Sequence, residues 1–150
     1  MRPTYETEDD LQRESEVIKK IESAWKCQAV KLSIKYSLDY GLKRADKVVA
    51  FCEIKTRNYT MESIGKMGGY LLSLGKWTAA KQLSDATKLP FFLIAKTLDG
   101  VYYAQFNSQI NDSFSIDDVL FRGRTDRNDW QDIEPCVLLN VSRFNKLQEQ

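Results

Sequence analysis

The chain has 150 residues, of which 43% are hydrophobic and 29% charged, and its formal net charge is +1. These values are typical of a soluble globular protein, and the length suits one domain spanning residues 1–150. The sequence contains no histidine, which excludes Ser-His-Asp and Cys-His catalysis and most zinc sites. No apolar stretch approaches the roughly 18 residues of a membrane span, and the first ten residues do not resemble a targeting peptide. We therefore expect no membrane association and a cytoplasmic location.

The small net charge hides an uneven distribution. Residues 26–90 carry 12 basic and 5 acidic side chains, whereas acids are in excess in residues 1–25 and 91–150. A positive central segment would attract a phosphate backbone, although an accidental distribution of surface charge is the alternative. Cys27, Cys52 and Cys136 are odd in number and widely spaced, so we expect free thiols.

The first half of the chain predicts a helix followed by a hairpin. Apolar residues recur at helical spacing over 8–25. Residues 29–37 alternate between apolar and polar side chains, as in a half-buried strand, and residues 37–40 continue or restart it. Residues 41–46 read as a polar turn and 47–55 as the returning strand. With the turn at about 43–45, Asp39 would pair close to residues 49–51, within a residue or two of register.

The second half predicts one more helical region and several strands. Residues 61–86 show helical spacing after a possible N-cap at Thr60, with a kink or late start expected at Gly68-Gly69. Two strands, 91–96 and 101–106, flank a tight turn at 98–100. Beyond a loop we expect a short strand at 119–122, a polar loop over 123–134, a strand at 137–141 and a short polar helix or frayed tail. The pattern indicates a mixed α/β layer fold.

The strand 47–55 ends in a charged pair. The apolar run Val48–Cys52 has the composition of a buried strand, yet Glu53 and Lys55 follow it, two residues apart and therefore on one face. Charged side chains are seldom buried in a sheet without a partner or a metal. The pair therefore indicates a functional site, with a purely structural buried Glu53–Lys55 ion pair as the alternative.

Two further carboxylates are predicted to converge on this pair. Asp39 lies across the hairpin from the end of the returning strand, close enough for its carboxylate and that of Glu53 to share a cation. On a helical wheel, Glu14 falls within the apolar stripe of the first helix and so faces inward, although it could instead pair with a neighbouring Lys or Arg. A hard divalent cation such as Mg²⁺, which takes oxygen ligands, would relieve the repulsion between the acids.

With these residues the sequence resembles the PD-(D/E)XK nuclease superfamily, over about residues 8–107, with 108–150 as a C-terminal extension. The resemblance implies a restriction-endonuclease-like αβββαβ core, with a central mixed sheet flanked by helices and an added C-terminal strand. It implies that Asp39, Glu53, the backbone carbonyl of Ile54 and Glu14 hold the metal, and that Lys55 handles the attacking water. Leu38 stands where the motif has proline, a position that is loose in the superfamily. If Glu14 is not the helix acid, Glu16 and Glu22 are the other candidates.

Several polar residues around this core are candidates for DNA contact. Each also has an ordinary structural explanation, such as a solvated strand end or a surface helix position. They are Lys31, Lys35, Arg57, Ser73, Lys76, Arg122 and Arg124.

The resemblance implies a nuclease that hydrolyses phosphodiester bonds in DNA with Mg²⁺, for which Mn²⁺ can substitute, with endonuclease activity favoured over exonuclease activity. Two subtypes fit the compact chain: a structure-selective or recombination nuclease, and a small site-specific endonuclease of the homing kind. A homo-oligomer, dimer or tetramer, is expected, in a bacterial or phage-infected cell. The alternative from another class is a catalytically inactive DNA-binding module of the same fold.

Overall fold

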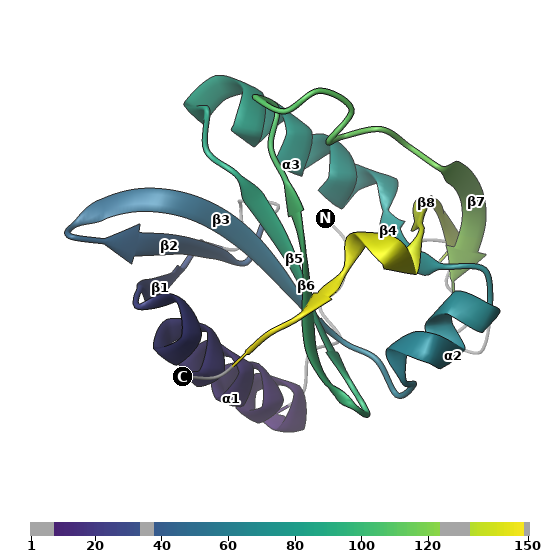
Figure 1. Ribbon diagram of the computed structural model, residues 1–150, viewed down its shortest axis with the longest axis horizontal. Coiled ribbons are helices and arrows are strands. Elements are labelled where there is room, and N and C mark those ends of the chain that lie inside the picture. The colour runs from purple at the N-terminus through teal and green to yellow at the C-terminus, as the bar shows by residue number, and fades with distance from the viewer. Residues whose placement is uncertain (1–7, 34–37, 124–132, 149–150) are drawn as a thin grey trace.

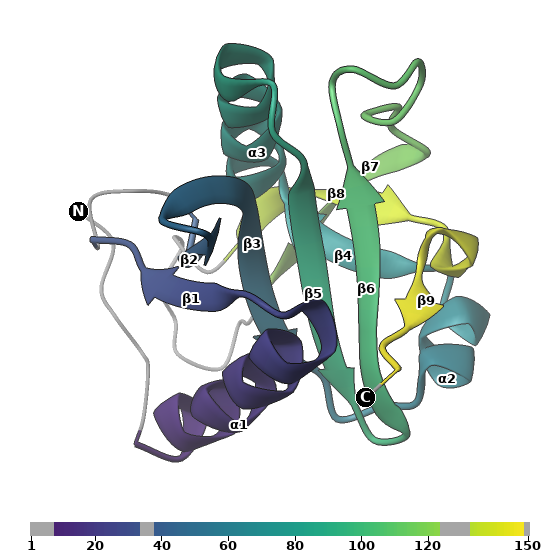
Figure 2. The ribbon, with the colours of Figure 1, turned by 60° about the vertical axis from the view of Figure 1, so that its left-hand side comes forward.

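The computed structural model describes residues 8–33, 38–123 and 133–148 and contains two sheets with helices packed around them (Figures 1 and 2). The larger sheet has the strand order β1-β2-β3-β5-β6-β9, and the smaller sheet has the order β4-β8-β7. The helices are α1 (Glu8–Trp25), α2 (Met61–Lys66), α3 (Leu74–Thr87) and the 3-10 helix η2 (Val141–Arg143). The strands are β1 (Gln28–Lys31), β2 (Tyr40–Arg44), β3 (Lys47–Thr56), β4 (Tyr70–Ser73), β5 (Phe91–Thr97), β6 (Gly100–Phe106), β7 (Asp118–Gly123), β8 (Ile133–Leu139) and β9 (Asn145–Lys146).

The larger sheet is mixed, which confirms the predicted fold class. Strands β3 and β5 run parallel at its centre, whereas β1, β2, β6 and β9 pair antiparallel to their neighbours. Parallel neighbours need a long crossover connection, and the segment from α2 through β4 to α3 provides it. The order of elements and the helices on both faces match a restriction-endonuclease-like core.

Helix α1 covers one face of the larger sheet, as the helical spacing over 8–25 predicted. Its buried residues Val17, Ile21 and Ala24 lie on one side of the helix and pack in a cluster with Cys52 and Ile54 of β3. None of the helices in the described ranges is long and apolar enough to cross a membrane.

The opposite face of the larger sheet is covered by α3 and the smaller sheet. Trp77 of α3, Tyr70 of β4 and Val137 of β8 pack in one cluster with Phe91 and Leu93 of β5. Side chains alternate along a strand, and Glu53 pairs with Leu93. Glu53 and Lys55 therefore point toward α3 and the smaller sheet, whereas Ile54 between them points toward α1.

The turn predicted over residues 41–46 of the β2–β3 hairpin is too long, and the register lies at the limit of the predicted range. Residues Gly41–Arg44, predicted as a turn, belong to β2, and the turn consists of Ala45 and Asp46 alone, both with positive φ. Two-residue turns of this kind suit the twist of a hairpin. Tyr40 consequently pairs with Cys52, so Asp39 lies beside Glu53 instead of opposite residues 49–51. Strand β1 ends at Lys31, and predicted strand residues 34–37 lie outside the described ranges.

The helical region predicted over 61–86 is interrupted at Gly68-Gly69, where a kink or late start was expected, but the strand that follows was not predicted. Helix α2 ends at Lys66, and Gly68 and Gly69 follow with φ values of 113° and 138°. Strand β4 then alternates between buried and half-buried side chains before α3 begins at Leu74. The pairing of β4 with β8, a contact distant in sequence, decides between helix and strand here.

The C-terminal segment forms more structure than predicted. Strand β7 extends one residue beyond each end of the predicted 119–122, and β8 begins at Ile133 instead of 137. The predicted polar helix or frayed tail is wrong: η2 and β9 occupy this region, and β9 pairs with β6. Leu147 after it is buried with α1, which anchors this segment to the larger sheet.

We predict that Gly69→Ala destabilises the fold. A Cβ at this position would lie 2.6 Å from the carbonyl oxygen of Leu139, and the φ of +138° disfavours any residue with a side chain. The free energy of unfolding should fall by about 1–3 kcal/mol in urea denaturation. Gly75→Ala is the matched control, because a Cβ there meets nothing within 4 Å, and it should leave stability equal or slightly higher. Equal stability of the two variants would contradict the role of Gly69.

Candidate active site

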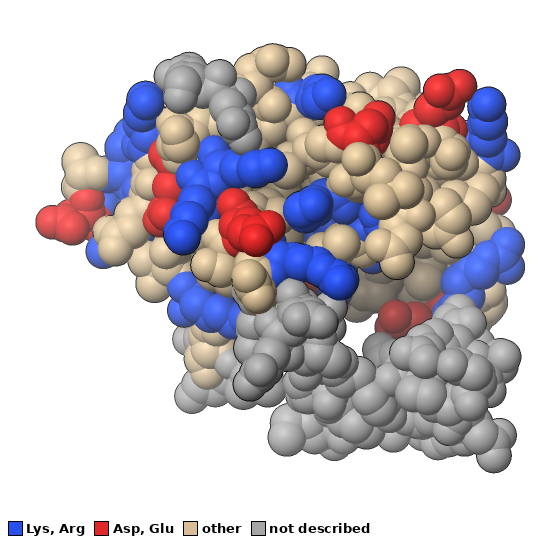
Figure 3. Space-filling view, turned by 90° about the horizontal axis from the view of Figure 1, so that it is seen from below, with Lys and Arg blue, Asp and Glu red and all other residues tan. Residues whose placement is uncertain are grey.

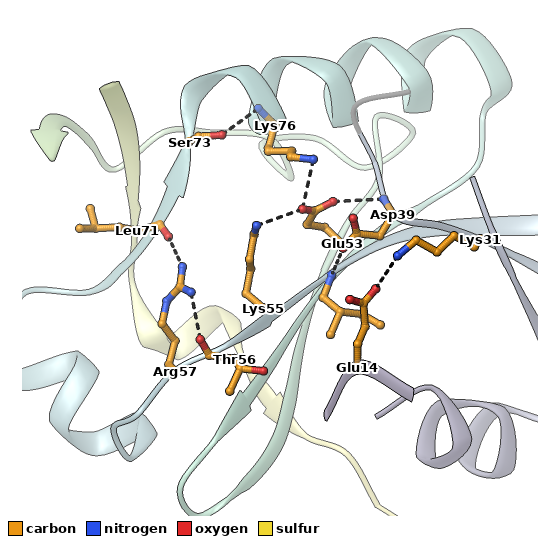
Figure 4. Close-up of polar contacts among 11 residues, drawn as sticks. Glu14, Lys31, Asp39, Glu53, Lys55, Thr56, Arg57, Leu71, Ser73 and Lys76 are labelled. Atoms are coloured by element: carbon orange, nitrogen blue, oxygen red, sulfur yellow. Dashed lines mark hydrogen bonds and ion pairs between the residues drawn. The ribbon is translucent and has the colours of Figure 1, made fainter. Parts of the chain in front are cut away.

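Glu53 is a fully buried carboxylate at the centre of a group of charged side chains (Figure 4). Its Oε1 lies 3.2 Å from Lys76 Nζ and 3.4 Å from Lys55 Nζ. Within the described residues, Oε1 accepts no well-aligned hydrogen bond, and its contacts with the two lysines are ion pairs. Both lysines are partly exposed, at 28% and 39% of their side-chain areas. The buried acid is thus in contact with two cations that also reach solvent.

Asp39 and Glu53 are held together by two reciprocal hydrogen bonds. The backbone N–H of Asp39 donates to Glu53 Oε2 at 3.2 Å, and the backbone N–H of Ile54 donates to Asp39 Oδ2 at 3.1 Å. Asp39 comes just before β2, so its side chain bonds to the backbone of β3 where the pairing of the two strands stops. Each carboxylate therefore has one oxygen fixed by a backbone N–H from the segment that carries the other acid.

The surroundings of Glu53 raise the pKa of its carboxyl group above the usual value. Burial is the main cause, because it penalises the charged form, and the negative charge of Asp39 adds to it. The positive charges of Lys55 and Lys76 act in the opposite direction and offset the shift only in part. The carboxyl group of Glu53 is therefore harder to ionise than an exposed one, even with two lysines beside it.

Lys76 reaches Glu53 because of how α3 begins. Ser73 is the N-cap of the helix, and its hydroxyl accepts a hydrogen bond from the backbone N–H of Lys76 at 3.2 Å. The cap places Lys76 in the first turn, above the end of β3 (Figure 4). The sequence predicts Lys76 as a substrate or metal-shell contact, with a surface lysine as the alternative, and does not predict its ion pair with Glu53. The serine three positions earlier was the available signal for the cap.

The structure places Glu14 on the α1 side of β3. Its Oε1 lies 3.4 Å from Lys31 Nζ, and its side chain is 12% exposed. Burial and the negative charge and hydrogen bond of Glu14 raise the pKa of Tyr40 well above its usual range. Figure 4 shows Glu14 facing Lys31, across the strand from Glu53. Glu14 thus both faces inward and pairs with a neighbouring lysine, so the two predicted alternatives occur together.

The other predicted DNA contacts divide into two groups. Arg57, Ser73, Lys76 and Arg122 line one pocket of about 290 Å³, together with Lys55, and Glu134 is its acidic residue. Lys31 lies with Glu14, away from this pocket. Lys35 and Arg124 lie outside the described ranges. Figure 3 shows one face of the molecule on which Lys and Arg side chains gather near the centre, with acidic side chains beside them.

The residues present fit a divalent cation between Asp39 and Glu53. Two adjacent carboxylates and a buried oxygen without a hydrogen bond are the donor set that a hard cation prefers. Within the described residues, no group of three or more His, Cys, Asp and Glu side chains is arranged to hold a metal. Any further ligands would therefore include backbone or solvent oxygens, as the predicted role of the Ile54 carbonyl requires.

We predict that, when no metal is bound, the raised pKa of Glu53 makes the folded chain less stable as pH rises. Because its pKa is raised on folding, the folded chain keeps a proton that the unfolded chain has lost. The free energy of unfolding should thus fall as pH rises from the ordinary value of 4.5 through the raised pKa, and this contribution levels off above it. In EDTA, Glu53→Gln should be more stable than the parent chain at neutral pH, and the difference should shrink toward acid pH.

Urea denaturation at several pH values measures this difference, and Glu62→Gln is its control. Glu62 has a 79% exposed side chain in an ion pair within α2, so the variant should follow the pH dependence of the parent. A constant difference between Glu53→Gln and the parent at all pH values would contradict the raised pKa.

Comparison with known proteins agrees with this geometry. A search of the curated proteins finds no match. A family model described as "Phage putative PDDEXK endonuclease" matches residues 1–147. The match spans nearly the whole chain and includes the hairpin that carries Asp39, Glu53 and Lys55. The chain therefore belongs to this phage family of PD-(D/E)XK endonucleases.

Proposed function

We propose that the protein is a Mg²⁺-dependent endonuclease that hydrolyses phosphodiester bonds in DNA. The observation that carries the proposal is the buried Glu53 carboxylate, which has one oxygen bonded to the backbone of Asp39 and the other facing two lysines. A structural acid in a sheet would be expected to have both oxygens satisfied. The family adds independent support, since its members are described as endonucleases.

Asp39 and Glu53 are proposed to hold the cation, with the Ile54 carbonyl as a further ligand. When bound, Mg²⁺ would offset the two negative charges and stabilise the charge that develops on a phosphate. Mn²⁺ has similar ligand preferences and should substitute for it. Glu14 lies with Lys31 on the other side of β3, so we propose that it acts on the site indirectly, through Lys31 and Tyr40.

The two lysines are proposed to have different roles from the acids. Lys55 Nζ and Lys76 Nζ both lie at Glu53 Oε1 and both reach solvent, where a phosphate would approach. A lysine in this position can orient the attacking water and stabilise negative charge on the phosphate oxygens. Lys55 lies on the same strand as Glu53, and we propose that it orients the attacking water. Lys76 approaches from α3.

A homo-oligomer is part of the proposal, because a duplex has two strands to cut. Strand β7 is an outer strand of the smaller sheet, and its residues Val119 and Phe121 are exposed by 42% and 71%. Outer strands with exposed apolar side chains are prone to pair with another chain. Sedimentation of the purified protein, with Phe121→Ser as the comparison, tests this part separately.

The structural alternative is supported by the Glu53–Lys55 ion pair, whose 3.4 Å distance is what a buried pair without a catalytic role would also have. This alternative accounts for the raised pKa, whose main cause is burial, but not for the second lysine at Glu53 Oε1. It requires that divalent cations do not bind. An inactive DNA-binding module would instead bind DNA and the cation without cutting.

We predict that the protein nicks or cuts plasmid DNA with Mg²⁺ or Mn²⁺ and that EDTA abolishes the reaction. Glu53→Ala, Asp39→Ala and Lys55→Ala should each lower the rate by at least about 100-fold, as expected when a group that stabilises the transition state is removed. Lys76→Ala should also lower it. Gel electrophoresis of supercoiled, linear, single-stranded and four-way-junction DNA measures the rates and narrows the substrate.

Lys66→Ala is the matched control for the lysine variants. Lys66 has a 76% exposed side chain on α2 and pairs only with Glu62 among the ion pairs of the described residues, so the variant should cut at the parental rate. If Glu53→Ala and Lys55→Ala cut as well as the parent, the assignment of the active site is wrong.

We predict that Mg²⁺ stabilises the parent chain but not Glu53→Gln. A ligand that binds only the folded state raises its stability by RT ln(1 + [L]/Kd), which is about 2.7 kcal/mol at 100 times Kd. Thermal unfolding with and without 10 mM Mg²⁺, and calorimetric titration with Mn²⁺, measure the effect. Equal stabilisation of both chains would show that the cation binds elsewhere.

A further inference from the structure

A second pocket adjoins the one beside Glu53. It has a volume of about 370 Å³ and shares Arg57, Leu71 and Arg122 with the pocket that Lys55 and Lys76 line. The two pockets therefore adjoin across these shared residues. Leu71 belongs to β4 and Arg122 to β7, and Arg57 follows the end of β3.

The two pockets differ in chemistry. The first has four cations, Lys55, Arg57, Lys76 and Arg122, and Glu134 as its acid. The second is lined mainly by apolar and aromatic side chains: Tyr59, Ile64, Met67, Leu120 and Leu138. Its volume lies within the ~300–1,000 Å³ of small-ligand sites. The pair of pockets thus combines a cationic subsite, which can bind a phosphate, with an apolar one, which can bind a base.

Arg57 is fixed at the boundary between the pockets. Its Nη1 donates to the carbonyl of Thr56 at 3.2 Å and its Nη2 to the carbonyl of Leu71 at 3.3 Å. The guanidinium also lies over the ring of Tyr70, with its Cζ 5.0 Å from the ring centroid. These are two of the five N–H donors of an arginine side chain. A guanidinium held in this way loses little entropy when it binds a phosphate.

The lining of the apolar pocket includes exposed apolar and aromatic side chains. Tyr59 and Met67 are 49% and 58% exposed, and both line the pocket together with Arg57. Within a duplex the faces of the bases are covered by their neighbours, so an apolar pocket gains nothing from paired DNA. An unpaired base can leave the stack and place its face against an aromatic ring.

We propose that the two pockets form a subsite for one unpaired nucleotide next to the scissile phosphate. Its phosphate would bind Arg57 and Arg122, and its base would stack on Tyr59 among Met67, Leu120 and Leu138. The inference rests on the proposed nuclease function and deepens it. It names the substrate class as DNA with an unpaired nucleotide beside the cut, such as a flap, a gap or a branch.

Direct binding tests the subsite without requiring cleavage. The probe is DNA with 2-aminopurine at one unpaired position of a flap, bound to Glu53→Gln so that no cutting occurs. Stacking on Tyr59 should quench the fluorescence of 2-aminopurine. The quenching should be weaker when the same DNA binds the double variant Glu53→Gln/Tyr59→Ala. Flapped DNA should bind about tenfold more tightly than the matched continuous duplex, and Tyr59→Ala should remove most of that preference.

Cleavage rates provide the second test. The parent should cut flapped DNA at least about tenfold faster than duplex, and Tyr59→Ala and Met67→Glu should lower only the rate on flapped DNA. Both residues are exposed, so these variants should fold. Ile110→Ala, which removes an equally exposed apolar side chain from the loop after β6, should keep the parental preference.

The possible failures can be distinguished. If the parent cuts duplex and flapped DNA equally, or if Tyr59→Ala keeps the preference, the subsite is wrong and the nuclease function stands. Tighter binding of a flap made of RNA would overturn the assignment to DNA. If no DNA is cut with any metal, the proposed function fails, and the fluorescence measurement still decides whether the unpaired base is bound.

Discussion

The interaction on which the rest of the site depends is the burial of a carboxylate in the central strand of a mixed sheet. Glu53 is fully buried in β3, between the apolar layer under α3 and the backbone of Asp39. Burying a charge in this way is unfavourable unless partners surround it. The neighbouring elements supply them: the segment before β2 offers a backbone N–H, β3 offers Lys55, and α3 offers Lys76. Burial nevertheless raises the pKa of Glu53, and a bound cation would favour its ionised form.

The sheet also separates two groups of charged residues. Alternation along β3 sends Glu53 and Lys55 to one face and Ile54 to the other, where α1 packs. Glu14 belongs to α1 and pairs with Lys31, so it approaches the strand from the opposite side. The resemblance to nucleases placed these acids in one ligand set. The geometry joins Asp39 and Glu53 by hydrogen bonds, whereas Glu14 pairs with Lys31 on the α1 side of the strand.

Much of the core could be predicted from the sequence because local patterns and long-range contacts agree there. The apolar face of α1 and the strands β5 and β6 followed from periodicity, and Glu53 stood out because charge follows a buried run. The split of residues 61–86 could not be predicted, since Tyr70–Ser73 becomes a strand only by pairing with β8. The extent of the hairpin turn could not be predicted, because Gly41–Arg44 look like a turn but extend β2. The contact of Lys76 with Glu53 depends on that same split, which sets where α3 begins.

The pairing of β4 with β8 has a consequence for how the protein acquires its function during folding. Ser73 pairs with Cys136 in the smaller sheet and also caps α3, so the position of Lys76 depends on a strand near the other end of the chain. Contacts so distant in sequence form late, because closing a long loop must precede them. During synthesis the hairpin with Asp39 and Glu53 emerges well before β8. We expect the hairpin that carries Asp39 and Glu53 to fold first. The contact of Lys76 with Glu53 should form only after the C-terminal strands have emerged.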